Sequence, residues 1–223
     1  LPVDRAWTFD LALTMSAGRQ YENTRELSFG SSSLYSLGAP ASVGNPTLGA
    51  TRWLFVGPGR LGVGGFAALP LSLLFQHNEV QLFGAAALRG LWDYWQWAQR
   101  AGALAVAGEY RFALDALDLG GSWTLGGMIR LDGASDVVFF AQLGATALYR
   151  LRGRSGVGLD LRAVWFPAID GLFQVSMVPR GRLALGRADL DLWFALNLNE
   201  PLGFSFDADR YWGLGTTFTW HLD

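Results

Sequence analysis

The feature that most constrains this chain is a period-two alternation of apolar and polar residues without any long apolar run. The 223-residue chain is 51% hydrophobic, yet no stretch reaches the about 20 consecutive apolar residues that a membrane-spanning helix needs. Instead, stretches of about ten residues place large apolar side chains at every second position, as a strand with one apolar and one polar face does. The chain is therefore expected to be all-β.

Six stretches carry the alternation most clearly, and they run from Trp7 to Met15, Leu104 to Leu114, Trp123 to Leu131, Val157 to Trp165, Leu190 to Leu198 and Trp212 to Leu222. Their polar faces hold charged residues in mid-strand, and their apolar faces end in Trp or Tyr, as expected where a barrel meets lipid headgroups. This pattern favours a transmembrane antiparallel up-and-down β-barrel. A soluble barrel or sandwich also alternates and is the alternative.

Turn residues divide the single domain, residues 1–223, into about twelve strands. The expected strands are 5–15, 27–37, 47–56, 61–75, 79–90, 101–114, 119–131, 137–151, 156–166, 172–184, 188–198 and 210–222. Because 27–37 is rich in Ser and Gly, ten strands are the alternative. Within the third to fifth expected strands, the stretches 51–56, 62–75 and 81–88 are apolar or small on both faces, so either the inner wall is apolar there or something packs against it. An even count places both termini at one end, opposite the long connectors 16–26, 92–100 and 199–210.

This pattern resembles the outer-membrane β-barrel proteins of Gram-negative bacteria as a class. The C-terminal TFTWHLD alternates as the last strand of such barrels does, although Trp220 is followed by His221, Leu222 and Asp223 rather than ending on an aromatic residue. The resemblance implies an outer-membrane location with periplasmic N- and C-termini. It also implies contact with membrane lipids and lipopolysaccharide, with other envelope proteins as further candidate partners.

Composition argues against several other functions. Lys and Arg total 17 against 19 Asp and Glu, which argues against a nucleic-acid partner. There is no Cys, and neither of the two histidines, His77 and His221, has the Ser or ligand neighbours that a catalytic triad or a metal site needs. We therefore expect no enzymatic activity, no metal and no cofactor.

The alternation places charged residues on the inner face of the barrel: Glu109, Arg111, Arg130, Asp160, Arg162, Asp189 and Asp191. These charges have two interpretations. The arginines can line a water-filled path that favours anions, or the same residues can form ion pairs that fill the interior. The first interpretation predicts a passive channel for small solutes, with a preference for anions. The second predicts a non-conducting barrel that anchors or stabilises a larger envelope assembly.

The two ends of the barrel differ in charge and in aromatic content. A basic group is expected at the periplasmic mouth and comprises Arg150, Arg152, Arg154, Arg182 and Arg187. Membrane-interface aromatics are expected at Trp7, Trp92, Trp95, Trp97, Trp123, Trp165, Trp212 and Trp220. The segment Trp92–Trp97 is expected to seat a loop among headgroups, with stacking on a sugar or lipid chain, or a protein contact, as the alternatives.

Overall fold

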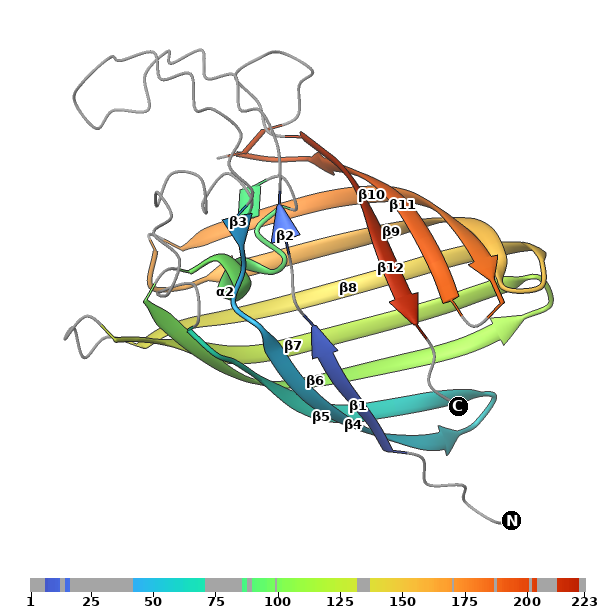
Figure 1. Ribbon diagram of the computed structural model, residues 1–223, viewed down its shortest axis with the longest axis horizontal. Helices are drawn as coiled ribbons and strands as arrows, with labels where there is room; N and C mark the ends of the chain where they lie inside the picture. The colour runs from blue at the N-terminus through green and yellow to red at the C-terminus, as the bar shows by residue number, and fades with distance from the viewer. Residues whose placement is uncertain are drawn as a thin grey trace.

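The computed structural model describes residues 7–12, 15–16, 42–70, 86–87, 90–98, 100–131, 137–169, 171–186, 188–200, 202–203 and 212–220. They confirm the all-β expectation, with ten strands in one antiparallel sheet (Figure 1). The strands are β1 (Trp7–Ala12), β4 (Thr47–Val56), β5 (Gly59–Ala68), β6 (Ala101–Leu114), β7 (Leu117–Arg130), β8 (Val137–Arg152), β9 (Ser155–Phe166), β10 (Leu172–Leu185), β11 (Ala188–Asn197) and β12 (Trp212–Trp220). A separate pair joins β2 (Met15–Ser16) to β3 (Ser42–Val43), and α2 (Tyr94–Trp97) is a single turn of helix. Within this described part of the chain, no helix has the length and apolarity to cross a membrane.

Each strand of the sheet pairs with the next strand along the chain, in the order β1-β4-β5-β6-β7-β8-β9-β10-β11-β12. This up-and-down order places the ends of β1, β5 and β11, which lead into the long connectors, at one end of the sheet, and the short turns, the start of β1 and the end of β12 at the other. The sheet curls so that its edge strands β1 and β12 come to the same side of the molecule (Figure 1). No pairing joins β1 to β12 among the described residues, so the sheet is open rather than closed.

In the sheet formed by the described residues there are ten strands, the alternative count, rather than twelve. The expected strand 79–90 is wrong, because β5 pairs directly with β6 and residues 86–87 are helical. The expected strand 27–37 lies outside the described residues, and β1 pairs directly with β4 without a strand between them. Residues 81–88 show no clear alternation of apolar and polar side chains, and the sequence pattern alone does not distinguish a strand from a helical segment here.

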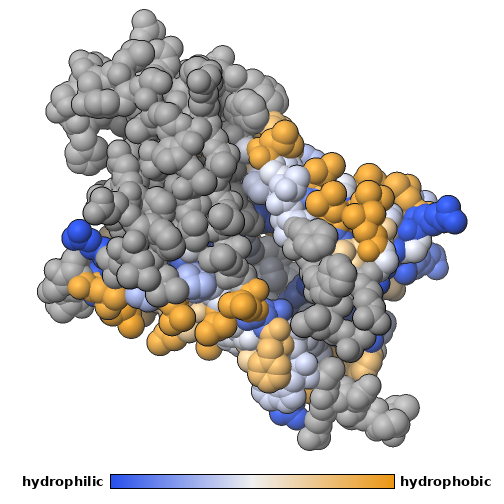
Figure 2. Space-filling model, viewed as in Figure 1, coloured by the Kyte–Doolittle hydropathy of each residue, from blue (hydrophilic) through white to orange (hydrophobic). Residues whose placement is uncertain are grey.

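The two faces of the sheet differ as the alternation predicts. Leu104, Val106, Leu125, Phe139 and Leu143 are examples of large apolar side chains that are exposed on the outer, convex face. Figure 2 shows apolar side chains along the outer surface of the described strands. The buried polar and charged side chains belong to the alternate positions of the strands, which face the concave side. A sheet of this size thus has an outer surface that is unusually apolar for a protein in water.

The concave side is filled at the end that carries the long connectors. The segment 86–98, of which residues 86–87 and 90–98 are described, packs here against inward-facing side chains of β7 to β9. The indole of Trp95 lies between Phe66 and Phe140, at ring-centroid distances of 4.9 and 5.0 Å. We call residues 86–87 and 90–98 the plug segment.

The plug segment overturns one prediction about aromatic residues. Trp95 and Trp97 are only 6% and 3% exposed and belong to the buried core, so they do not lie at a lipid interface. Trp92 is half-buried, packs against the same core and lines a cavity. Aromatic side chains are removed from water both inside a curled sheet and among lipid headgroups, so local composition does not distinguish these two locations.

Candidate ligand cavity inside the curled sheet

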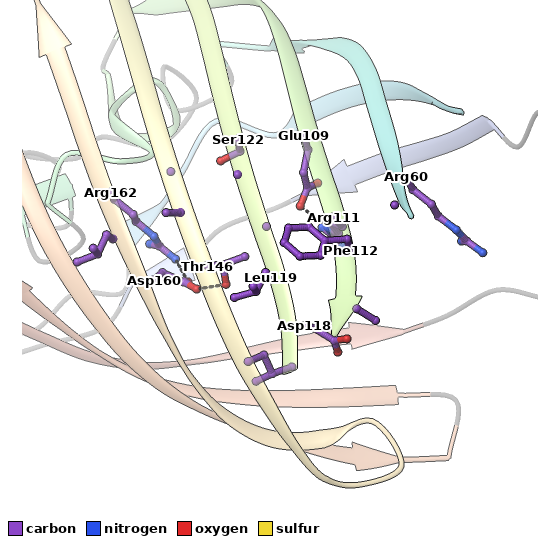
Figure 3. Close-up of a pocket in the computed structure, with 18 of the residues that line it drawn as sticks. Arg60, Glu109, Arg111, Phe112, Asp118, Leu119, Ser122, Thr146, Asp160 and Arg162 are labelled. Atoms are coloured by element: carbon purple, nitrogen blue, oxygen red, sulfur yellow. Dashed lines mark hydrogen bonds and ion pairs between the residues drawn. The ribbon is translucent and has the colours of Figure 1, made fainter. Parts of the chain in front are cut away.

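A cavity of about 650 Å³ lies on the concave side, between the plug segment and the short turns. Strands β5 to β10 contribute to its wall, and residues of the β4–β5 turn at 57–58 lie at its margin. Figure 3 shows charged side chains from β6 on one side and from β9 on the other. Among the described residues, the charged side chains that line it are those of five arginines, Arg60, Arg111, Arg162, Arg180 and Arg182, and three acids, Glu109, Asp118 and Asp160.

The register of the strands explains why the cavity exists. One row of directly paired residues runs across the wall from Glu109 through Ser122 and Gly144 to Arg162. The next row runs from Arg111 through Gly120 and Thr146 to Asp160. Directly paired residues share one face of a sheet. Long charged side chains on β6 and β9 are therefore separated by small residues on β7 and β8, which leave space above the sheet.

The β9–β10 side of the cavity is organised around one carboxylate. Asp160 receives a hydrogen bond from Arg162 Nη2 at 3.0 Å and lies 3.2 Å from Arg180 Nε. Thr146 donates to Asp160 at 2.6 Å and accepts from Arg180 Nη2 at 2.9 Å. All three charged side chains are largely buried. Two guanidinium groups thus share one carboxylate in a partly desolvated position.

Further ion pairs continue towards the short turns. Arg182 forms a two-point contact with Asp191, with Nε and Nη2 at 2.9 and 3.1 Å from the two carboxylate oxygens. Arg154 reaches Asp189 at 3.3 Å and also donates to the carbonyl of Gly186 at 2.6 Å. These contacts tie the β8–β9 turn and β10 to β11. The carboxylates of Asp189 and Asp191 are buried, so their arginine partners offset the desolvation.

The β6 side of the cavity is more open to solvent. Arg111 contacts Glu109, and its guanidinium lies 5.4 Å from the ring centre of Trp53. Arg60 lies 4.9 Å from the ring centre of Phe55. Arg60 and Arg111 are paired directly across β5 and β6. This side therefore presents cationic and aromatic groups without the dense pairing seen around Asp160.

The inner end of the cavity is closed by Trp92 of the plug segment. The guanidinium of Arg162 lies 5.4 Å from the centre of the Trp92 ring, within the range of a cation–π contact. A Cβ atom at Gly144 would lie 3.2 Å from Trp92 Cη2 and 2.5 Å from Ser122 Oγ. Glycine at this position therefore leaves room for the indole. Gln142 donates its side-chain amide to the carbonyl of Trp92 and fixes the backbone there.

Side-chain amides hold the plug segment from three places in the fold. Asn45, before β4, donates to the carbonyls of Trp95 and Ala98, both at 3.0 Å, and its backbone N–H donates to Gln96. Asn197 on β11 donates to the carbonyl of Ala87 at 3.2 Å. Together with Gln142 on β8, these bonds satisfy backbone carbonyls of a segment that has little regular structure of its own. The plug segment is thus an anchored part of the interior.

The structure separates the charged residues predicted for the interior. Glu109, Arg111, Asp160 and Arg162 line the cavity, Asp189 and Asp191 lie behind it in ion pairs, and Arg130 is exposed at the far end of β7. Of the predicted basic mouth, Arg182 lines the cavity, and Arg150 lies 3.4 Å from Asp118. Arg152 and Arg154 are exposed at the β8–β9 turn. Arg187 lies outside the described residues.

The remaining predicted aromatics lie on the sheet. Trp7, Trp123 and Trp165 are exposed on its outer face. Trp212 and Trp220 begin and end β12, and their side chains lie outside the description, as do His77 and His221. The role of these tryptophans at a membrane interface stays a prediction.

Sequence reasoning missed the amides that hold the plug segment, Asn45, Gln142 and Asn197. Gln142 and Asn197 occupy inward-facing positions of alternating strands. A polar, uncharged residue among large apolar neighbours at such a position is a sequence signal for a buried hydrogen bond. Asn45 has no such signal, because its partners at 95, 98 and 101 are about 50 residues away and are all backbone carbonyls. Backbone acceptors carry no residue-type signature in a sequence.

Comparison with models of known protein families gave no match for this chain. Comparison with curated proteins and with solved structures gave none either. The proposals that follow therefore rest on the cavity, the plug segment and the two faces of the sheet.

Proposed function

We propose that this chain is a β-barrel of the Gram-negative outer membrane, with the short turns and both termini in the periplasm and the long connectors outside. The observation that carries the proposal is the outer face of the sheet, where exposed large apolar side chains recur along the strands. Water makes such a surface unfavourable, whereas acyl chains and the apolar part of lipopolysaccharide cover it without cost. Short periplasmic turns and longer outer loops are the usual arrangement in bacterial barrels.

The interior favours a barrel that does not conduct in its resting form. The passive anion channel predicted from the sequence needs a continuous path, whereas the cavity ends at Trp92 and the plug segment is hydrogen-bonded to the wall. We therefore propose the non-conducting barrel, an anchor or stabilising unit of the envelope, as the main function. The anion channel is the second candidate, favoured by the five arginines against three acids around the cavity.

A pair of matched substitutions tests the membrane position. Leu143 and Leu151 both face outward on β8 and are 65% and 66% exposed, but Leu143 lies mid-strand and Leu151 near the strand end. In lipid, Leu143→Arg should lower the free energy of unfolding by about 2–4 kcal/mol and Leu151→Arg by about 0–1 kcal/mol. Reversible urea unfolding in lipid vesicles measures both. Equal, small effects would contradict a membrane position, because an exposed Leu of a water-soluble sheet tolerates Arg at either depth.

Conductance in a planar bilayer decides between the two candidate functions. For the intact protein we expect no discrete steps, because the plug segment closes the interior. The reversal potential under a salt gradient gives the selectivity of any steps that do occur. Steps with anion preference in the intact protein would reject the closed barrel and support the channel.

A further inference from the structure

We infer that the cavity is a binding site for an amphiphilic anion, a carboxylate, sulfonate or phosphate group attached to a flat apolar body. The inference rests on the cavity and holds whether the barrel conducts or is closed. It goes beyond the proposed function because it assigns the interior a ligand. The anionic group lies at the Asp160 cluster on β9 and β10, and the apolar body lies over the small residues of β7 and β8.

The charge of the cavity selects an anion. Among the described residues, five arginines and three acids line it, and the difference of two leaves this part of the lining net positive. In the inner part, the guanidinium groups of Arg162 and Arg180 lie 3.0 and 3.2 Å from the carboxylate of Asp160. An entering anion stabilises positive charge in a partly desolvated wall more than a neutral ligand does, because hydrogen bonds from guanidinium to an ionised acceptor are about twice as strong as neutral ones.

The shape of the cavity selects a flat body rather than a bare ion. Gly120 faces the cavity from β7, whereas Gly144 on β8 lies against the Trp92 indole. The floor between Arg111 on one side and Arg162 on the other carries short side chains, among them Ser122 and Thr146 (Figure 3). Trp92 closes the inner end, and Phe55 lies near the mouth. Aromatic surfaces of this kind stack on flat apolar groups.

The size of the cavity agrees with this class of ligand. Its volume of about 650 Å³ falls within the about 300–1,000 Å³ of typical small-molecule sites, which combine apolar walls with a few placed polar groups. An inorganic ion would fill only a small part of it. The margin at residues 57–60 lies at the end with the short turns, so a ligand enters from the periplasmic side in the proposed orientation.

Calorimetric titration of the full-length protein in a non-ionic detergent tests the inference. The probe is naphthalenesulfonate, and naphthalenemethanol is the uncharged control of the same ring system. We expect the sulfonate to bind at one site per chain and the alcohol to bind at least about tenfold more weakly, the effect of losing one charge-assisted contact. Equal affinity for the two probes would overturn the inference, because it would reduce the site to apolar partition into the cavity or the micelle.

Three variants locate the site. Arg180→Gln should weaken sulfonate binding about tenfold, whereas Arg152→Gln, at an exposed arginine that does not line the cavity, should leave it unchanged. Asp160→Asn removes the acid that Arg162 and Arg180 share and should tighten binding instead. Circular dichroism confirms that each variant retains its strands. Equal effects of the two arginine variants, or weaker binding by folded Asp160→Asn, would overturn the inference.

The two proposals fail independently in these experiments. Sulfonate binding in detergent with no depth dependence at Leu143 and Leu151 would retain the ligand site and reject the membrane barrel. A depth-dependent effect at Leu143 and Leu151 without selective sulfonate binding would retain the membrane barrel and reject the ligand site. Steps in the planar bilayer that the sulfonate blocks from one side would support the ligand site within a conducting barrel.

Discussion

At the scale of single residues, the interior of this protein depends on side-chain amides that donate to backbone carbonyls. Asn45 is fully buried, and its Nδ2 atom has three carbonyl oxygens within 3.3 Å, those of Trp95, Ala98 and Ala101. Turns within the plug segment satisfy some of its carbonyls, such as those of Ala86 and Leu91, and others, such as that of Trp95, accept from side chains elsewhere in the fold. Hydrogen-bond donors at fixed positions around the segment hold it in one conformation, because hydrogen bonds are directional and apolar packing is not.

Asn45→Ala should therefore destabilise the protein more than its small size suggests. The substitution leaves buried carbonyls without a donor, and we expect the free energy of unfolding to fall by about 2 kcal/mol. Urea unfolding followed by tryptophan fluorescence measures the change. Thr216→Ala, at an exposed position of β12, is the control and should change stability by less than about 0.5 kcal/mol. Similar unfolding curves for the two variants would show that the amide does not hold the segment.

At the scale of elements, α2 and the residues around it act as the core that the sheet lacks by itself. The Trp95 indole packs on Phe66 of β5 and Phe140 of β8, and Tyr94 meets Phe166 of β9 at 5.3 Å. Small inward-facing residues would leave empty space at this end of a curled sheet, and atoms around an empty space lose van der Waals contacts. The plug segment fills that space. At the other end the equivalent space is left open and forms the cavity.

Trp95→Ala tests whether this insertion closes the interior. Loss of a buried Trp side chain should cost about 3–5 kcal/mol of stability, and in planar bilayers the variant should show openings that the intact protein lacks. Trp165→Ala, at an outward-facing position that is 47% exposed, is the matched control and should show no openings. Openings of equal frequency in both variants would mean that the plug segment does not close the path.

The strands were predictable from sequence where one face is apolar and the other polar, as in β6, β7, β9 and β11. There the alternation gives both the element and the face, and Asp160 and Arg162 fall on the concave side as expected. The plug segment was not predictable, because residues 81–88 show no clear alternation of apolar and polar side chains. Its position depends on contacts between residues about 50 apart, such as Asn45 with Trp95 and Trp92 with Gln142. Contacts between residues so far apart in the sequence depend on the whole fold, and no local sequence pattern indicates them.

At the scale of the whole molecule, the remaining question is how the sheet ends. The strands β1 and β12 are its edges, and in lipid an unpaired edge is costly because no water satisfies its N–H and C=O groups. Ten strands in up-and-down order make β1 and β12 antiparallel, so they have the directions that a closing pair needs. Closure would also bring the outward apolar residues of both strands into one continuous belt.

A cysteine pair across this seam tests closure, and the absence of native cysteine gives a clean background. Thr8 accepts a hydrogen bond from Trp53 Nε1 and Thr217 one from Trp193 Nε1, and both partner side chains belong to inward positions. Thr8→Cys combined with Thr217→Cys or Thr219→Cys should form a disulfide under mild oxidation in vesicles, since paired strands bring such residues within about 4.4–6.8 Å between Cα atoms. Phe9→Cys with Thr217→Cys is the control, because Phe9 faces outward and should not cross-link. A closed barrel would be rejected if the control pair cross-linked efficiently. It would also be rejected if no inward pair cross-linked, including Asp10→Cys combined with Thr217→Cys or Thr219→Cys. The apolar outer face would then need a protein partner rather than a complete ring of lipid.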